Sequence, residues 1–100
     1  MTVFWASFEY KYGSQIDNLE GGFVYVFVNA ENSKNALEKI SQKFNEENII
    51  SVKVEFIEVY NPKTEWENSV QTKHYNDLYT SALNSLEVIL DDFYAYKRSK

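Results

Sequence analysis

A run of six apolar residues at positions 23–28 constrains the fold of this 100-residue chain more than any other stretch. In an extended strand, its phenylalanines and tyrosine point to one side and its valines to the other, so neither side suits water. Such a strand belongs in the middle of a sheet or needs a partner to cover it, because an exposed apolar strand invites association. A polar turn and an amphipathic pattern follow directly, which predicts a helix packed on the sheet.

The segment after this run carries signals for the start and the end of a helix. Asn32 is a suitable N-cap residue, because its side chain can accept a hydrogen bond from a free backbone N–H of the first turn. Apolar residues then recur at helical spacing up to Phe44, with lysines and glutamates on the other side. The pattern predicts a helix from about Ser33 that ends between Asn45 and Asn48, since asparagine tolerates a left-handed cap.

Two further stretches alternate between apolar and polar residues, as strands with one buried face do. The first, residues 3–12, places its aromatic residues on one side, with Trp5 and Glu9 on the other. The second, residues 50–56, changes phase at Ile57, which indicates a β-bulge or a second buried surface there. Pro62 then marks the end of this strand, because proline lacks the N–H donor that a strand ladder needs.

The last third of the chain predicts one long helix over residues 75–96. Leu78, Ala82, Ile89 and neighbouring apolar residues form a broad stripe at helical spacing. At about 1.5 Å per residue, this helix would be about 33 Å long and would extend beyond a small sheet. Part of it would then contact a second copy of the chain or another protein. Residues 62–74 show no clear periodicity, and residues 97–100 are expected to fray.

The order ββαβα predicts an α+β fold in two layers, with a three-stranded, mostly antiparallel sheet packed against two helices. The length suits a single domain over residues 1–96, followed by a basic tail at residues 97–100. Two strand orders stay open. A right-handed crossover from the second strand to the third can leave the first strand between them, or it can pair the second and third strands directly. The apolar run favours a middle position for the second strand, or pairing of its edge with a second copy.

Composition excludes several kinds of site. The chain has no cysteine, which rules out disulfides, thiolate zinc sites and cysteine nucleophiles. Its three glycines form no phosphate-binding or dinucleotide-binding motif, and no cofactor or metal site is predicted. The net charge of −5 disfavours direct binding to nucleic acid, even on the open sheet face expected around Trp5, Glu9 and Lys53. No apolar run approaches the ~20 residues of a membrane-spanning helix and no secretion signal is visible, so a cytoplasmic protein is expected.

His74, the only histidine, is the residue with the clearest capacity for acid–base or metal chemistry. Either role would need a carboxylate to orient the ring and a cleft to hold a ligand. No ligand spacing is recognisable around it. A solvent-exposed histidine near a helix start is therefore the simpler interpretation.

The segment around Trp66 suits contact with another protein. Glu65 and Glu67 flank the tryptophan, so in an extended segment the two carboxylates point to one side and the indole to the other. Aromatic residues such as Trp66 and Tyr60 often dominate the binding energy of interfaces. The simpler alternative is a solvated loop whose tryptophan is anchored in the core.

An acidic stripe on the predicted last helix is a second candidate contact. Glu87 and Asp91 are four residues apart and would repel one another by about a few tenths of a kcal/mol. An acidic stripe that is present despite this repulsion can serve to bind a basic partner. The simpler alternative is an ordinary solvated helix face. The residues predicted to contact a partner are thus Tyr60, Glu65, Trp66, Glu67, Glu87 and Asp91.

These features favour a small acidic protein without catalytic activity that occupies the surface of another protein, as immunity proteins, phage-encoded inhibitors and adaptor modules do. A basic partner, such as a protein that handles nucleic acid, suits the acidic charge. The alternative is a homodimeric small-ligand-binding protein or enzyme with a pocket between the sheet and the long helix. The residues that would line this pocket are Tyr10, Tyr25, Tyr79 and Tyr94.

Overall fold

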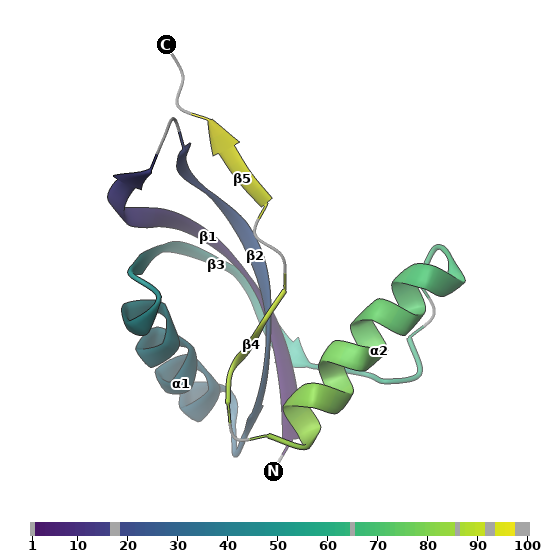
Figure 1. The fold of residues 1–100 in the computed structure, drawn as a ribbon. Coiled ribbons are helices and arrows are strands. Elements are labelled where there is room, and N and C mark those ends of the chain that lie inside the picture. Colours follow the sequence, from purple (N-terminus) through teal and green to yellow (C-terminus); the bar gives the residue numbers. More distant parts are fainter. Residues whose placement is uncertain (1, 17–18, 65, 86, 92–93, 98–100) are drawn as a thin grey trace.

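The two helices of this protein lie on opposite sides of a curved sheet (Figure 1). The computed structural model describes the backbone of residues 2–16, 19–64, 66–85, 87–91 and 94–97, and the side chains of residues 2–12, 21–64, 66–85 and 87–91. Its elements are β1 (Thr2–Ile16), β2 (Leu19–Ala30), α1 (Ser33–Glu46), β3 (Ile49–Val59), α2 (Ser69–Leu83), β4 (Ile89–Leu90) and β5 (Tyr94–Lys97). The α+β class and an antiparallel sheet are confirmed. The predicted count of three strands is wrong, because β4 and β5 join the sheet, and the fold has three layers where the sequence predicted two.

The sheet is antiparallel, with the strand order β3-β1-β2-β4, and β5 also pairs with β2. β1 therefore lies between β2 and β3, which is one of the two orders left open above. β2 is an interior strand, because β4 and β5 follow one another along the edge that β1 does not occupy. Among the three predicted strands, the middle position favoured for β2 is therefore wrong, because β1 occupies it, and the added strands β4 and β5 supply the second neighbour that the apolar run of β2 requires.

The first core lies between the sheet and α1. β1 alternates as predicted, and its even-numbered residues from Phe4 to Tyr10 are buried on this side with valines of β2. The side chain of Asn32 caps α1 by accepting a hydrogen bond from the Asn35 N–H at 2.9 Å. The buried residues of the helix are Ala36, Ile40 and Phe44. The predicted start, cap and buried face of this helix are confirmed.

The second core lies on the opposite side, between the sheet and α2. Val3 and Trp5 of β1 and Tyr25 and Phe27 of β2 pack here against the helix. The buried members of this core are Val3, Phe27, Tyr60, Tyr75 and Ala82. Because each face of β2 meets a different helix, its apolar run is needed on both sides.

The long C-terminal helix predicted over residues 75–96 is wrong at both ends. α2 begins at Ser69, after Asn68 caps it by accepting a hydrogen bond from the Gln71 N–H at 2.8 Å. It ends at Leu83, and residues 89–90 form β4 instead. Residues 98–100 of the basic tail lie outside the described part. Neither helix of the described chain has the length and the apolar character to cross a membrane.

A β-bulge interrupts β3 near the predicted change of phase. Ser7 of β1 pairs with Phe56, and the residue after Ser7 pairs with Val54, so Glu55 is an extra residue in β3. A second register shift lies farther along the same pair of strands. Bulges increase the local twist of a strand, which agrees with the curvature of the sheet in Figure 1.

Candidate functional site

An aromatic cluster fills the space between α2 and the sheet. Its centre is Trp5 of β1, whose ring centroid lies between 4.7 and 6.1 Å from those of five other residues. These are Tyr25, Phe27, Phe56, Tyr60 and Trp66. Tyr75 of α2 joins the cluster with its ring centroid 4.3 Å from that of Trp66. Tilted and edge-on pairs of this kind add about 0.5–1.5 kcal/mol each beyond burial, so the cluster anchors α2 to the sheet.

Tyr60 and Trp66, both predicted to contact a partner, belong to this cluster. Tyr60 is buried, and its hydroxyl accepts a hydrogen bond from Nε1 of Trp66 at 3.4 Å. Trp66 is only partly buried. Tyr60 therefore has the position of a core residue, whereas Trp66 keeps an exposed surface that another molecule can reach. Glu65 lies outside the described residues.

Trp66 and Glu67 line a hollow of about 490 Å³ at the start of α2. Glu67 is exposed there. The other lining residues are Asn68, Ser69, Thr72, Lys73 and Asn76. The hollow combines one aromatic surface with amide, hydroxyl and charged groups, so it suits polar contacts that adapt to their partner better than a buried apolar ligand. We call it the helix hollow.

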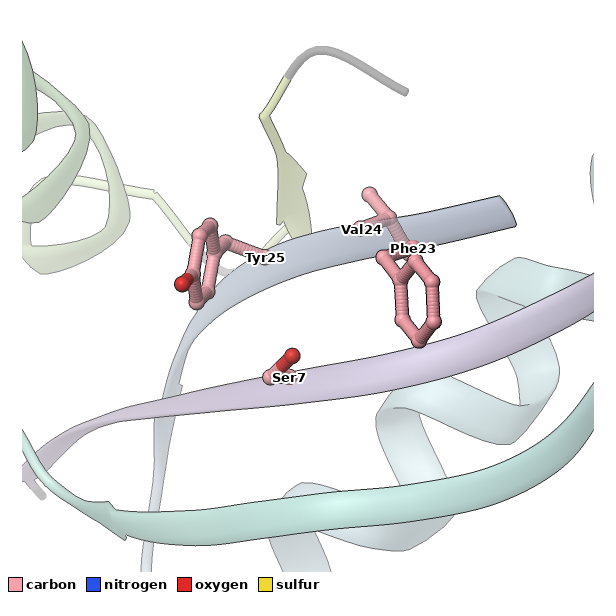
Figure 2. A pocket seen from close by; sticks show the side chains of 4 residues that line it. All are labelled: Ser7, Phe23, Val24 and Tyr25. Atoms are coloured by element: carbon pink, nitrogen blue, oxygen red, sulfur yellow. The ribbon is translucent and has the colours of Figure 1, made fainter. Parts of the chain in front are cut away.

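A second hollow, of about 360 Å³, lies on the sheet beside the part that α2 covers. Its described lining residues are Ser7, Phe23, Val24 and Tyr25. Figure 2 shows Phe23 and Tyr25 projecting from β2 beside Ser7 of β1. The side chain of Phe23 is 43% exposed although β2 is an interior strand. We call this concave surface the sheet hollow.

The sheet hollow exists because a small residue stands between aromatic ones. Ser7 pairs with Tyr25 of β2 and with Phe56 of β3. Paired residues of antiparallel strands share a face, so the serine leaves space between two rings. In the next row, Glu9 stands between Phe23 and a lysine of β3. Of the sheet face expected to be open, the Trp5 end packs in the second core with α2, whereas Glu9 is partly exposed and Lys53 is exposed.

Glu87 and Asp91 do not share a surface. The helix predicted to carry both ends at Leu83. Glu87 is exposed and lines a polar hollow beside α1 with Lys39 and Lys43. Asp91 is 5% exposed and lies on the side of α2. The predicted acidic stripe is wrong, because the chain between the two carboxylates forms a strand at the sheet edge instead of a helix.

Asp91 forms a hydrogen-bonded pair with His74 of α2. Nε2 of His74 lies 2.8 Å from Oδ1 of Asp91, and the Asp91 N–H donates to the Tyr25 carbonyl at 2.9 Å. The carboxylate that a functional histidine would need is therefore present. Within the described part of the chain, however, no group of three potential metal ligands occurs. The pair acts as a structural link that ties α2 to the segment after β4.

His74→Ala should lower the free energy of unfolding by about 1–3 kcal/mol, because the buried Asp91 carboxylate loses this hydrogen bond. Urea denaturation followed by tryptophan fluorescence measures the change. Asp77→Ala is the matched control on the same helix, since Asp77 pairs with Lys73 at 2.7 Å but both side chains are mostly exposed. Its expected loss is about 0–1 kcal/mol. Equal losses for both variants would show that burial adds nothing to the His74–Asp91 pair.

The predicted tyrosine-lined pocket is not formed. Tyr10 is buried on the α1 side of the sheet, whereas Tyr25 and Tyr79 pack in the second core. The side chain of Tyr94 lies outside the described part. Because Tyr10 and Tyr25 lie on opposite faces, one pocket between the sheet and a helix cannot contain both.

Comparisons with protein-family models, with curated proteins and with solved structures found no match to this chain. A functional proposal therefore rests on the two aromatic hollows. Sequence reasoning identified Trp66 and Glu67 of the helix hollow. It did not identify Ser7 and Phe23 of the sheet hollow, although the small residue within an aromatic strand at position 7 is a signal that could have indicated it.

Proposed function

We propose that this chain is a small cytoplasmic protein-binding module without enzymatic activity, which acts as an inhibitor or adaptor by occupying a surface of another protein. The observation that carries the proposal is the sheet hollow, where Phe23 remains exposed beside a serine and a tyrosine. Exposed aromatic side chains around a concave apolar surface are typical of interface hot spots, where a partner side chain is desolvated.

The partner that fits this surface inserts an apolar or aromatic side chain into the sheet hollow and carries basic residues around it. Glu9 and Glu58 lie on the same sheet face, paired in register with Phe23 and Trp5. The net charge of −5 adds a long-range attraction for a basic protein. Complementary charge raises association rates and disfavours wrong partners. A protein that handles nucleic acid is one class with this chemistry.

The helix hollow extends the proposed contact. Trp66 contacts Trp5 in the aromatic cluster, with ring centroids 5.5 Å apart, and therefore lies on the same side of the sheet as Phe23. Glu67 supplies an exposed carboxylate next to it. Glu87 lies on the α1 side and is not part of this surface.

Ser7→Phe should reduce capture of the partner at least about tenfold, because the new ring fills the sheet hollow. The measurement is affinity capture with tagged wild-type and variant chains, followed by quantitative mass spectrometry. Val70→Ala is the matched control: Val70 is a mostly exposed residue of α2 that is not among the described lining residues of either hollow. Circular dichroism verifies that each variant is folded.

The expected result is one stoichiometric protein that wild type and Val70→Ala retain and Ser7→Phe loses. A partner retained equally by all three chains would contradict the role of the sheet hollow. A wild-type chain that captures no other protein would contradict the binding function itself.

A further inference from the structure

The floor of the sheet hollow holds a buried hydroxyl. The side chain of Ser7 is 9% exposed, and within the part of the chain that the structure describes its hydroxyl has no hydrogen-bond partner. Figure 2 shows this hydroxyl directed into the space between Phe23 and Tyr25. Buried polar groups of folded proteins are nearly always hydrogen-bonded. A lone hydroxyl at the floor of an aromatic hollow therefore marks a place for a polar group of another molecule.

The walls of the sheet hollow set the shape of what can enter it. Phe23 and Tyr25 are two residues apart on β2 and project from the same face. Since a strand rises about 3.4 Å per residue, the two side chains start about 6.8 Å apart. Carbon atoms in contact lie about 3.5 Å apart, so a flat group that touches both walls needs about 7 Å. The space suits one planar group and is too narrow for a branched aliphatic side chain.

The charge of the sheet hollow separates the planar side chains from one another. Its described lining residues are all uncharged. An arginine inserted there would lose its water without gaining a carboxylate, whereas an aromatic ring gains from leaving water. Tyrosine carries its hydroxyl at the far end of the ring, so a ring that enters end-on brings this group to the floor. The phenol O–H can donate to Oγ of Ser7, which has two acceptor positions.

We propose that the sheet hollow binds a tyrosine side chain of the partner protein, with the ring between Phe23 and Tyr25 and the phenol hydrogen-bonded to Ser7. This inference rests on the proposed function, because it names the side chain that the partner inserts. Basic residues beside that tyrosine would face Glu9, which pairs in register with Phe23. The aromatic walls accept phenylalanine as well, but phenylalanine leaves the hydroxyl of Ser7 without a partner. Ser7 is therefore the residue that selects tyrosine.

Two short peptides test this selection, acetyl-Lys-Tyr-Lys-amide and acetyl-Lys-Phe-Lys-amide, titrated up to about 10 mM and followed by heteronuclear NMR. Both should shift the amide signals of Ser7, Phe23 and Tyr25, and the tyrosine peptide should bind about two- to tenfold more tightly. Ser7→Ala should bind the two peptides equally. This variant should keep the wild-type Tm, because the lost hydroxyl has no hydrogen-bond partner within the described chain.

Ser51→Ala is the matched control, since Ser51 is exposed and its strand partner Tyr10 lies on the α1 side of the sheet. It should retain the preference for tyrosine. Equal binding of both peptides to the wild-type chain would overturn the inference. A preference that persists in Ser7→Ala, or the absence of any shift at about 10 mM peptide, would overturn it as well.

Affinity capture separates a failure of this inference from a failure of the proposed function. Ser7→Ala leaves the hollow open but removes the hydroxyl, so it should retain the partner about two- to tenfold more weakly than the wild-type chain. If Ser7→Ala captures the partner as well as wild type does while Ser7→Phe loses it, the tyrosine contact is wrong and the binding function stands. A wild-type chain that captures no protein contradicts the binding function and removes the partner to which the tyrosine would belong.

Discussion

Phe27→Ala should lower the free energy of unfolding by about 3–5 kcal/mol. Phe27 is 0% exposed, and its ring centroid lies 5.1 Å from that of Tyr60 and 6.4 Å from that of Tyr75. Truncation would leave a cavity beneath α2, surrounded by rings that the strands and the helix hold in place. Since domains of this size have a total stability of about 5–15 kcal/mol, the variant would retain little of it.

Urea unfolding measures this loss, with tryptophan fluorescence as the signal because Trp5 lies 6.1 Å from Phe27 between ring centroids. Val70→Ala, which truncates a mostly exposed residue of α2, should change stability by less than about 0.5 kcal/mol. Hydrogen exchange should show a greater loss of protection in α2 than in α1, because the two helices pack on different cores. A loss below about 1 kcal/mol would contradict the packing of α2 on this face.

Gly21→Ala should cost about 3 kcal/mol, although it adds only one methyl group. A Cβ atom at this position would lie 2.0 Å from the carbonyl oxygen of Tyr10 and 2.9 Å from the Cα of Lys11. Both are backbone atoms of the neighbouring strand, so a change of rotamer cannot relieve the overlap. β1 and β2 would have to separate where Gly21 pairs with Lys11.

Thermal unfolding measures the effect of the Gly21 substitution. For a domain of this size, a loss of about 3 kcal/mol corresponds to a decrease in Tm of roughly 12–24 °C. Ser51→Ala on the exposed part of β3 is the control for a small change in a strand and should move Tm by only a few degrees, about 0–4 °C. A Gly21→Ala variant with an unchanged Tm would contradict the close approach of the two strands.

The first helix could be predicted from the sequence because its signals act within a short segment. Asn32 caps the helix, and the apolar spacing up to Phe44 matches the buried face. The start of α2 carries a similar signal, Asn68 followed by Gln71 at the third helical position. It was missed because the residues around it lack apolar periodicity. Capping chemistry was therefore the more informative signal at this site.

The end of α2 shows where periodicity misleads. The apolar spacing continues past Asn84, so the sequence alone is compatible with a longer helix. In the structure, Ile89 and Leu90 pair with Phe27 and Val26 of β2. The backbone N–H and C=O groups of β2 on the side away from β1 need hydrogen-bond partners. This requirement outweighs the local helical preference of residues 89–90. Asn84 and Ser85, which favour turns, are the local sign of the break.

The candidate site was predictable only in part for the same reason. Trp66 and Glu67 were identified because residue type alone suggested contact. The sheet hollow depends on Ser7 of β1 lying between Tyr25 of β2 and Phe56 of β3. No pattern within one strand shows which residues of the others stand beside it.

The sequence by itself determined the α+β class, the first helix with its cap, the two-sided burial of β2 around residues 26–28 and the inward face of β1. These properties follow from propensity, capping and alternation, which depend on residues a few positions apart. Only the tertiary structure decided that the helices cover opposite faces, that residues 89–90 become a strand beside β2, and that His74 meets Asp91. Those outcomes depend on contacts between residues far apart in the chain, whose register and burial are set when the sheet assembles.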